Sequence, residues 1–175
     1  ILIENVDQVP DMQEWEKKQW KAEAKFLKAY FHFNLIRKWG PIPIVRESLP
    51  IDADVEQVRV YRDPIDDCFD YVIELLDEAI PDLPQVNPSV DEYGRTNQVI
   101  AASLKARVSV YAASPLFNNN VDQAPLVDAR GIQLFPQDKS EAEQQKRWED
   151  AVVACKEAID LAKLAVIGNV GDMMA

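Results

Sequence analysis

KAEAKFLKAYFHFNLIRKWGPIPIVR, from Lys21 to Arg46, is the stretch that decides the fold. On a helical wheel of about 100° per residue, one narrow stripe holds the polar side chains Lys21, Lys25, Lys28 and His32. Most other positions up to Ile36 are apolar. Because a surface helix needs only one apolar face, this pattern predicts neighbours on at least two sides. We therefore expect a long helix inside a helical layer or a stack of hairpins.

The end of this helix is marked by glycine and proline. Gly40 suits a left-handed C-cap, and Pro41 cannot continue a helix. Pro43 favours an extended backbone at Ile42. The helix is therefore expected to end near Trp39 and to be followed by an extended segment.

Capping residues and apolar periodicity predict three more helices. Together with the first helix, Gln13–Trp39, the expected helices are Pro64–Ile80, Asn97–Ser114 and Glu141–Leu164. The expected caps are Asp11 with Glu14, Asp63, Thr96, and Ser140 with Glu143. The third helix is rich in alanine and serine, which predicts a central position because small side chains let neighbouring backbones approach closely.

No series of alternating strands is visible, so we predict an all-α chain of stacked helical hairpins, of tetratricopeptide-like type, with long irregular loops. The first predicted helix pairs with the second, and the third pairs with the fourth, in antiparallel hairpins. Each hairpin leaves an apolar face that another hairpin can cover. The phrase WEDAVVACKEAI from Trp148 is similar to a tetratricopeptide helix. Residues 1–175 are expected to form a single helical domain.

Composition excludes several functional classes. The net charge is −11 over 175 residues, which argues against nucleic acid as a partner. We interpret the lysines of the first helix as a solvated face. Cys68 and Cys155 lie at apolar helix positions, and His32 is the only histidine, so neither a metal site nor a cofactor is expected. No catalytic constellation is present, and we predict that the chain is not an enzyme.

Several phrases, in a fixed order, resemble one protein family. They are Glu23–Tyr30 (EAKFLKAY), Leu35–Pro43 (LIRKWGPIP), Ile73–Leu83, Gly94–Thr96, Ala102–Ala113, Ser114–Asn118 and Trp148–Leu161. Together they are similar to the SusD/RagB family of nutrient-binding outer-membrane lipoproteins from the Bacteroidetes. The resemblance covers roughly Gln13 to Leu164.

This resemblance implies a tetratricopeptide-like helical core and a non-catalytic function. Family members capture oligosaccharides, and sometimes peptides, at the cell surface and deliver them to a SusC-like TonB-dependent outer-membrane transporter. The chain would then be an internal fragment of a longer SusD-like protein, held at the outer membrane through a lipid anchor outside the fragment. The alternative is a helical-repeat scaffold whose ligand is another protein.

Candidate ligand contacts lie in loops, because the helix faces are committed to packing. The loops are Trp39–Arg46, Gln85–Arg95 and Ser114–Lys139. The amides of Asn118, Asn119 and Asn120 can bind sugar hydroxyls, and the rings of Trp39 and Tyr93 suit a pyranose. The alternatives are that Trp39 packs at the helix end and that the asparagines satisfy turn geometry.

Two charged residues stand among apolar or small neighbours. Glu23 lies off the polar stripe of the first helix, and Arg107 lies in the small-residue helix. Buried charges need partners, so we predict a structural ion pair between Glu23 and Arg107 or, failing that, between Glu23 and Arg37.

Overall fold

The computed structural model describes residues 1–87 and 89–173. Four long helices dominate it: α2 (Glu14–Trp39), α4 (Ile65–Ala79), α5 (Gln98–Ala113) and α6 (Glu141–Met173). The short helices are α1 (Leu2–Asn5), α3 (Val55–Val58) and the 3-10 turns Val6–Gln8, Ile80–Asp82, Val90–Glu92 and Val121–Gln123. Within the described residues there is no β-strand, so the all-α prediction is confirmed.

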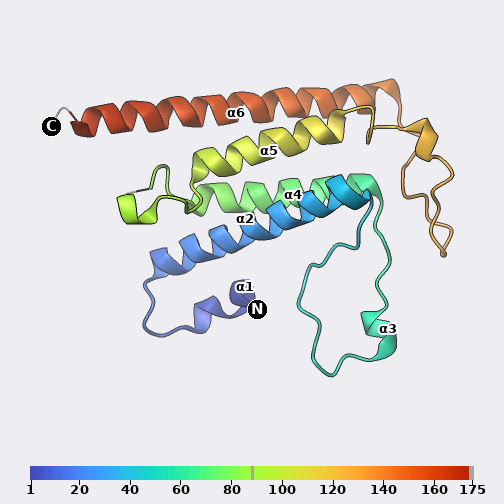
Figure 1. The fold of residues 1–175 in the computed structure, drawn as a ribbon, viewed down its shortest axis with the longest axis horizontal. Coiled ribbons are helices and arrows are strands. Elements are labelled where there is room, and N and C mark those ends of the chain that lie inside the picture. Colours follow the sequence, from blue (N-terminus) through green and yellow to red (C-terminus); the bar gives the residue numbers. More distant parts are fainter. Residues whose placement is uncertain (88, 174–175) are drawn as a thin grey trace.

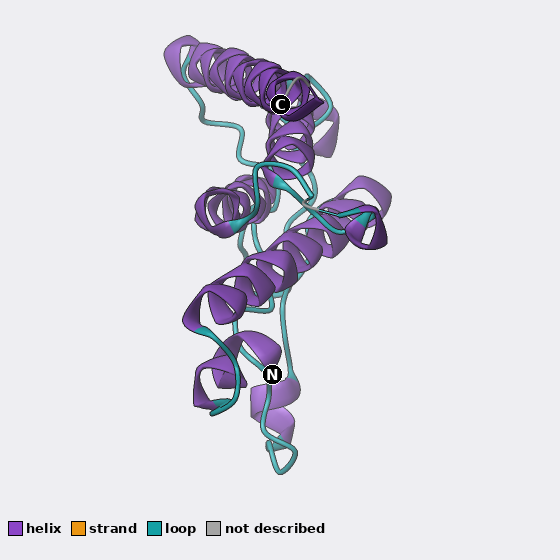
Figure 2. Ribbon diagram, turned by 90° about the vertical axis from the view of Figure 1, so that its left-hand side faces the viewer, coloured by secondary structure: helices purple, strands orange, loops and turns teal. Residues whose placement is uncertain are grey.

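The long helices form two antiparallel hairpins, α2 with α4 and α5 with α6 (Figure 1). Helix α5 also packs on α4, which stacks one hairpin on the other. Seen from the side, the helices follow each other from the N-terminal turns at one edge to α6 at the other (Figure 2). This is the predicted arrangement of stacked hairpins.

The observed helix ends agree with the predicted punctuation and correct three of the caps. Gly40 has φ of +70°, which favours glycine, and its N–H donates to the Ile36 carbonyl at 2.8 Å. The first capping box is formed by Gln13 and Glu16 instead of Asp11 and Glu14. Asn97, instead of Thr96, caps α5 by accepting from the Ile100 N–H at 3.0 Å.

At α4 the expected cap is also wrong, and at α6 it is confirmed. Pro64 precedes α4 without a side-chain cap, because the Asp63 carboxylate accepts a different N–H. At α6, the Ser140 N–H donates to Glu143 at 2.8 Å, and the Glu143 N–H donates to the Ser140 hydroxyl at 3.3 Å.

The core lies between α2, α4 and α5. Its largest fully buried side chains are Phe33, Phe69, Ile36, Ile65, Leu76, Val72 and Val108. Helix α5 contributes buried alanines, so that α4 and α6 can pack closely on its two sides. The predicted central position of the small-residue helix is thus confirmed.

The two cysteines differ in their surroundings. Cys68 is buried, and burial raises the pKa of its thiol to about 11. The thiol donates to the Ile42 carbonyl at 3.4 Å. Its interpretation as a small buried hydrophobe is confirmed. Cys155 is only partly buried, so the same interpretation fits it less well.

Most of the polar stripe of α2 faces α4 instead of solvent, whereas Lys21 pairs with Asp7 of the N-terminal 3-10 turn. Lys25 pairs with Glu78 at 2.7 Å, and the Lys28 ammonium lies over the Tyr71 ring. His32 is buried with its ring edge-on to that of Tyr71, at 5.3 Å between centroids. Within the described residues, an apolar side of α2 is left exposed, which contradicts the expected cover on two sides. The stripe turns toward α4 because Glu78 and the Tyr71 ring of α4 attract Lys25 and Lys28, and the opposite, apolar side then faces outward.

Candidate functional site

Two of the three predicted loops meet at one end of the helical layer, beside the starts of α4 and α6 (Figure 1). The extended segment after Gly40 runs along the start of α4. There the Asp63 N–H donates to the Ile42 carbonyl at 3.0 Å, and the Ile44 N–H donates to the Asp63 carboxylate at 2.7 Å. This segment is therefore fixed to the helical core by its backbone.

The long loop Ser114–Lys139 has a defined internal structure. Leu134 donates its N–H to the Leu126 carbonyl at 3.0 Å and accepts from the Ile65 N–H of α4 at 2.9 Å. The Phe135 ring is buried. Because its backbone pairs both with itself and with α4, the loop presents a fixed surface.

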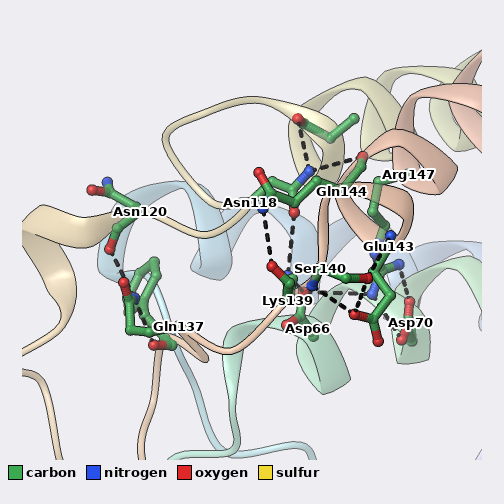
Figure 3. Close-up of polar contacts among 12 residues, drawn as sticks. Asp66, Asp70, Asn118, Asn120, Gln137, Lys139, Ser140, Glu143, Gln144 and Arg147 are labelled. Atoms are coloured by element: carbon green, nitrogen blue, oxygen red, sulfur yellow. Dashed lines mark hydrogen bonds and ion pairs between the residues drawn. The ribbon is translucent and has the colours of Figure 1, made fainter.

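Asn118 is buried inside this loop end, and its side-chain amide makes three contacts within the chain (Figure 3). The amide nitrogen donates to the carbonyls of Ala113 at 3.4 Å and Gln144 at 3.2 Å. The amide oxygen accepts from Lys139 at 3.4 Å. Asn118 therefore connects the end of α5 to the start of α6.

A cluster of charged residues lies next to Asn118 (Figure 3). The Asp66 carboxylate of α4 pairs with Lys139 at 2.6 Å and with Arg147 at 3.5 Å. Arg147 also pairs with Asp70, with one N–O distance of 3.0 Å. No local sequence pattern predicts this cluster, because Asp66 and Lys139 are 73 residues apart.

The other two predicted asparagines take part in turns. Asn119 has φ of +58°, a left-handed conformation that asparagine tolerates. Its amide oxygen is buried without a hydrogen-bond partner among the described residues. Asn120 accepts from the Asp122 N–H at 3.0 Å and donates to the Leu116 carbonyl at 2.9 Å. Turn geometry thus explains much of this triplet, and its ligand role stays a prediction.

The two predicted aromatic residues are both exposed but belong to opposite ends of the layer. Trp39 is 67% exposed and Tyr93 is 72% exposed. The C-terminal end of α2 lies beside the long loop, whereas the segment that precedes α5 lies at the far end (Figure 1). The structure therefore does not place Trp39 and Tyr93 in one site. Trp39 is too exposed to be the packing residue of the alternative interpretation.

The predicted Glu23–Arg107 pair is wrong. Arg95 donates to the Glu23 carboxylate at 2.8 Å and to Glu92 at 2.8 Å. Arg107 is exposed over the Tyr111 ring, and the Arg37 guanidinium also lies over that ring, at 5.4 Å. Position 107 is on the outer side of α5. Because small residues lie all around this helix, its sequence does not indicate which side faces outward.

A cleft of about 390 Å³ opens beside the charged cluster. Its lining residues are Asp66, Asp70, Lys139, Glu143, Lys146, Arg147 and Asp150. Carboxylates and cationic donors of this kind can hydrogen-bond to hydroxyl groups. Asp66 already accepts from Lys139 and Arg147, so its capacity for a ligand is reduced.

Comparison with known proteins gives one family. Residues 1–110 match the family model described as starch-binding associating with outer membrane. The chain belongs to the SusD-like family. A curated SusD-like relative, protein P25 of Formosa agariphila, is 23% identical over 174 residues, which is 99% of this chain and 26% of the relative.

Solved structures of SusD-like proteins have the same arrangement of helices. The structure of BT4246 is 33% identical, with a TM-score of 0.83, and the match covers 93% of this chain and 28% of that protein. A laminarin-binding SusD-like protein is 26% identical, with a TM-score of 0.57 over 75% of this chain and 29% of its own. The chain thus spans between a quarter and a third of the length of each of these three proteins.

Among the described residues, none of the helices combines the length and the apolar character that a membrane span requires.

Proposed function

We propose that this SusD-like chain is part of a non-catalytic surface protein that captures oligosaccharides and delivers them to a SusC-like TonB-dependent transporter. In this proposal the protein is held at the outer membrane, on the cell surface, by a lipid anchor outside the 175 residues. The stacked hairpins are the scaffold, and the loops at the α4–α6 end contribute to the ligand surface.

The observation that supports this proposal most directly is the exposed Trp39 ring next to a fixed loop surface. Trp39 is 67% exposed, although a side chain of this size usually packs against its neighbours. The apolar face of an indole ring can stack on a pyranose. The likeness to a laminarin-binding SusD-like protein favours a glycan as the ligand.

The test compares two exposed tryptophans of α2 in the full-length protein. Trp15 is 65% exposed and lies at the other end of the helix, so Trp15→Ala is a matched control for Trp39→Ala. Isothermal titration with laminarin oligosaccharides and other soluble glycans measures the affinity. We expect Trp39→Ala to weaken binding by about two- to twelvefold, since an aromatic contact contributes on the order of 0.5–1.5 kcal/mol, and Trp15→Ala to leave binding unchanged. Equal effects of the two variants would remove Trp39 from the site.

The alternative function, a scaffold for another protein, is favoured by the exposed apolar side of α2. It predicts that no glycan binds the full-length protein and that a protein partner does.

A further inference from the structure

Two contacting helices are free of acidic residues where they lie together. The chain has 30 aspartates and glutamates, yet none of them lies in residues 24–46 or in residues 93–121. These ranges contain the second part of α2 and the whole of α5, which contact each other. Both helices end at the side of the layer where the candidate loops meet (Figure 1). The charges that α2 and α5 themselves bring to this end are therefore all positive.

An arginine from each helix lies over the same aromatic ring. The guanidinium carbons of Arg37 on α2 and Arg107 on α5 are 5.4 and 6.0 Å from the centroid of the Tyr111 ring. Arg37 also lies over the Phe33 ring, at 5.6 Å. Both arginines are exposed, so a ligand in solution can reach them.

The ring that holds the two guanidiniums is itself fixed. The Tyr111 ring is edge-on to that of Phe33, at 5.3 Å between centroids, and tilted against that of Phe117, at 6.5 Å. Phe33 and Phe117 are buried. Because cation–π contacts hold a guanidinium near a ring, this packing limits the freedom of both arginine side chains before any ligand binds.

Neither arginine has a carboxylate of its own. Within the part of the chain that the structure describes, no aspartate or glutamate oxygen lies within 4.0 Å of Arg37 or Arg107. Other arginines each pair with a carboxylate, namely Arg46, Arg59, Arg95, Arg130 and Arg147. Two neighbouring cations repel each other, and an anion bound by both relieves this repulsion.

We propose that Arg37 and Arg107 form a subsite for an acidic sugar of the captured oligosaccharide, one that bears a carboxylate or a sulfate ester. The inference rests on the function proposed above, because it takes the ligand to be a glycan. The N–H groups of a guanidinium match two oxygens of such an anion in a bidentate contact.

The position and the charge of the chain agree with this assignment. Trp39 follows Arg37 by two residues, so the subsite lies at the same end of α2 as the proposed stacking residue. The net charge of −11 repels anionic glycans in general, so an acidic glycan needs a local pair of cations in order to bind.

The test is isothermal titration of the full-length protein with three probes. Oligogalacturonate carries carboxylates, a sulfated galactan oligosaccharide carries sulfate esters, and a laminarin oligosaccharide is neutral. Arg37→Gln/Arg107→Gln removes both charges of the subsite. Arg59→Gln/Arg62→Gln is the matched control, because it removes two exposed arginines from the segment 47–62 and lowers the net charge equally.

We expect the parent to bind at least one of the two acidic probes. The Arg37→Gln/Arg107→Gln variant should bind that probe about tenfold more weakly or weaker still, because charge-assisted hydrogen bonds are lost, whereas the control should stay within about twofold of the parent. Added NaCl should weaken binding of the acidic probe and leave laminarin binding unchanged, since salt screens only charged ligands.

The outcomes separate this inference from the proposed function. Binding of laminarin alone would overturn the inference and leave glycan capture in place, whereas a protein that binds no glycan would contradict both. An acidic probe that binds the parent and the Arg37→Gln/Arg107→Gln variant equally would overturn the inference, as would equal losses in the two double variants.

A measurement of Tm tests whether the two arginines serve the fold instead of a ligand. The Arg37→Gln/Arg107→Gln variant should melt within a few degrees of the parent, because exposed cation–π contacts are weak. A larger loss of Tm would mean that the guanidiniums bind a carboxylate of the protein itself, and it would overturn the inference.

Discussion

Arg95 and Glu23 are 72 residues apart in the sequence, yet the Arg95 guanidinium donates through two of its nitrogens to one oxygen of Glu23, at 2.8 and 3.1 Å. A third nitrogen donates to Glu92 at 2.8 Å. Gln19, one turn before Glu23, donates to the same oxygen at 3.1 Å. The pair connects the segment before α5 to the side of α2.

Glu23→Gln is expected to destabilise the protein by about 1–2 kcal/mol. The Glu23 side chain is 22% exposed and the Arg95 side chain 35%, so solvent screens the pair only in part. Thermal or urea unfolding of the full-length protein measures the change. Glu56→Gln is the control, because its pair with Arg59 is 3.4 Å long and largely exposed, and its loss should cost less than about 0.5 kcal/mol. An equal loss of unfolding free energy in the two variants would mean that the Glu23 pair stabilises the protein no more than an exposed pair does.

Asp66→Asn is expected to cost about 2–3 kcal/mol and to loosen the start of α6. The substitution weakens two charge-assisted contacts, with Lys139 and Arg147, and the three side chains that make these contacts are 20% exposed or less. Hydrogen exchange should accelerate in residues 140–147 before it does so elsewhere in α6.

The control for Asp66→Asn is Asp150→Asn. The Asp150 pair with Lys146 is an i, i+4 contact between side chains that are 53% and 70% exposed. Its loss should change stability by about 0.5 kcal/mol or less. Unchanged exchange at the start of α6 in the Asp66 variant would show that the cluster does not hold that helix in place.

His32 should make the protein less stable as the pH falls below neutrality. Burial lowers the pKa of His32, a hydrogen bond to the Lys28 carbonyl opposes this shift, and the Lys28 charge adds to it. Since the ordinary pKa is about 6.5, the unfolded chain binds the proton first. The stabilisation is complete above that value and is lost as the pH falls toward the lower pKa of the folded state.

The measurement for His32 is the difference in Tm between pH 7.5 and pH 5.5, for the parent and for His32→Gln. Groups elsewhere in the protein affect both proteins equally, and His32 is the only histidine of this chain. The variant should show the smaller loss of Tm on acidification. An identical loss in both would show that His32 titrates normally.

Local signals in the sequence predicted the helices well. Gly40 ends α2 and Ser140 begins α6 as expected, because these residues act through backbone geometry and hydrogen bonds within one turn. The pairing of the helices followed from their apolar faces and from the order of the chain.

Partner choice over long distances could not be predicted in this way. Glu23 was assigned to Arg107 because both stand among apolar neighbours, but the rotation of α5 points Arg107 outward and the turn at Gly94 brings Arg95 to Glu23. The lysine stripe of α2 was misplaced for the same reason, since Glu78 on α4 decides which way Lys25 faces. Such contacts depend on tertiary packing, which one sequence does not specify residue by residue.

Asn118 and Asn119 are adjacent in the sequence and should respond differently to substitution. Asn118→Ala removes three hydrogen bonds at a buried position and is expected to cost about 1–3 kcal/mol, because the Gln144 carbonyl and the Lys139 ammonium each lose a partner. Asn119→Gly keeps the left-handed backbone at φ of +58° and removes only the amide, so its Tm should stay close to that of the parent.

Asn119 is thus the residue at which a glycan contact can be tested without disturbing the fold. If its amide binds sugar hydroxyls, as the sequence predicts, titration of the full-length Asn119→Gly protein with a glycan that the parent binds will show a weaker affinity and an unchanged Tm. An unchanged affinity would exclude the Asn119 amide from the binding site and would leave turn geometry as the explanation of this position.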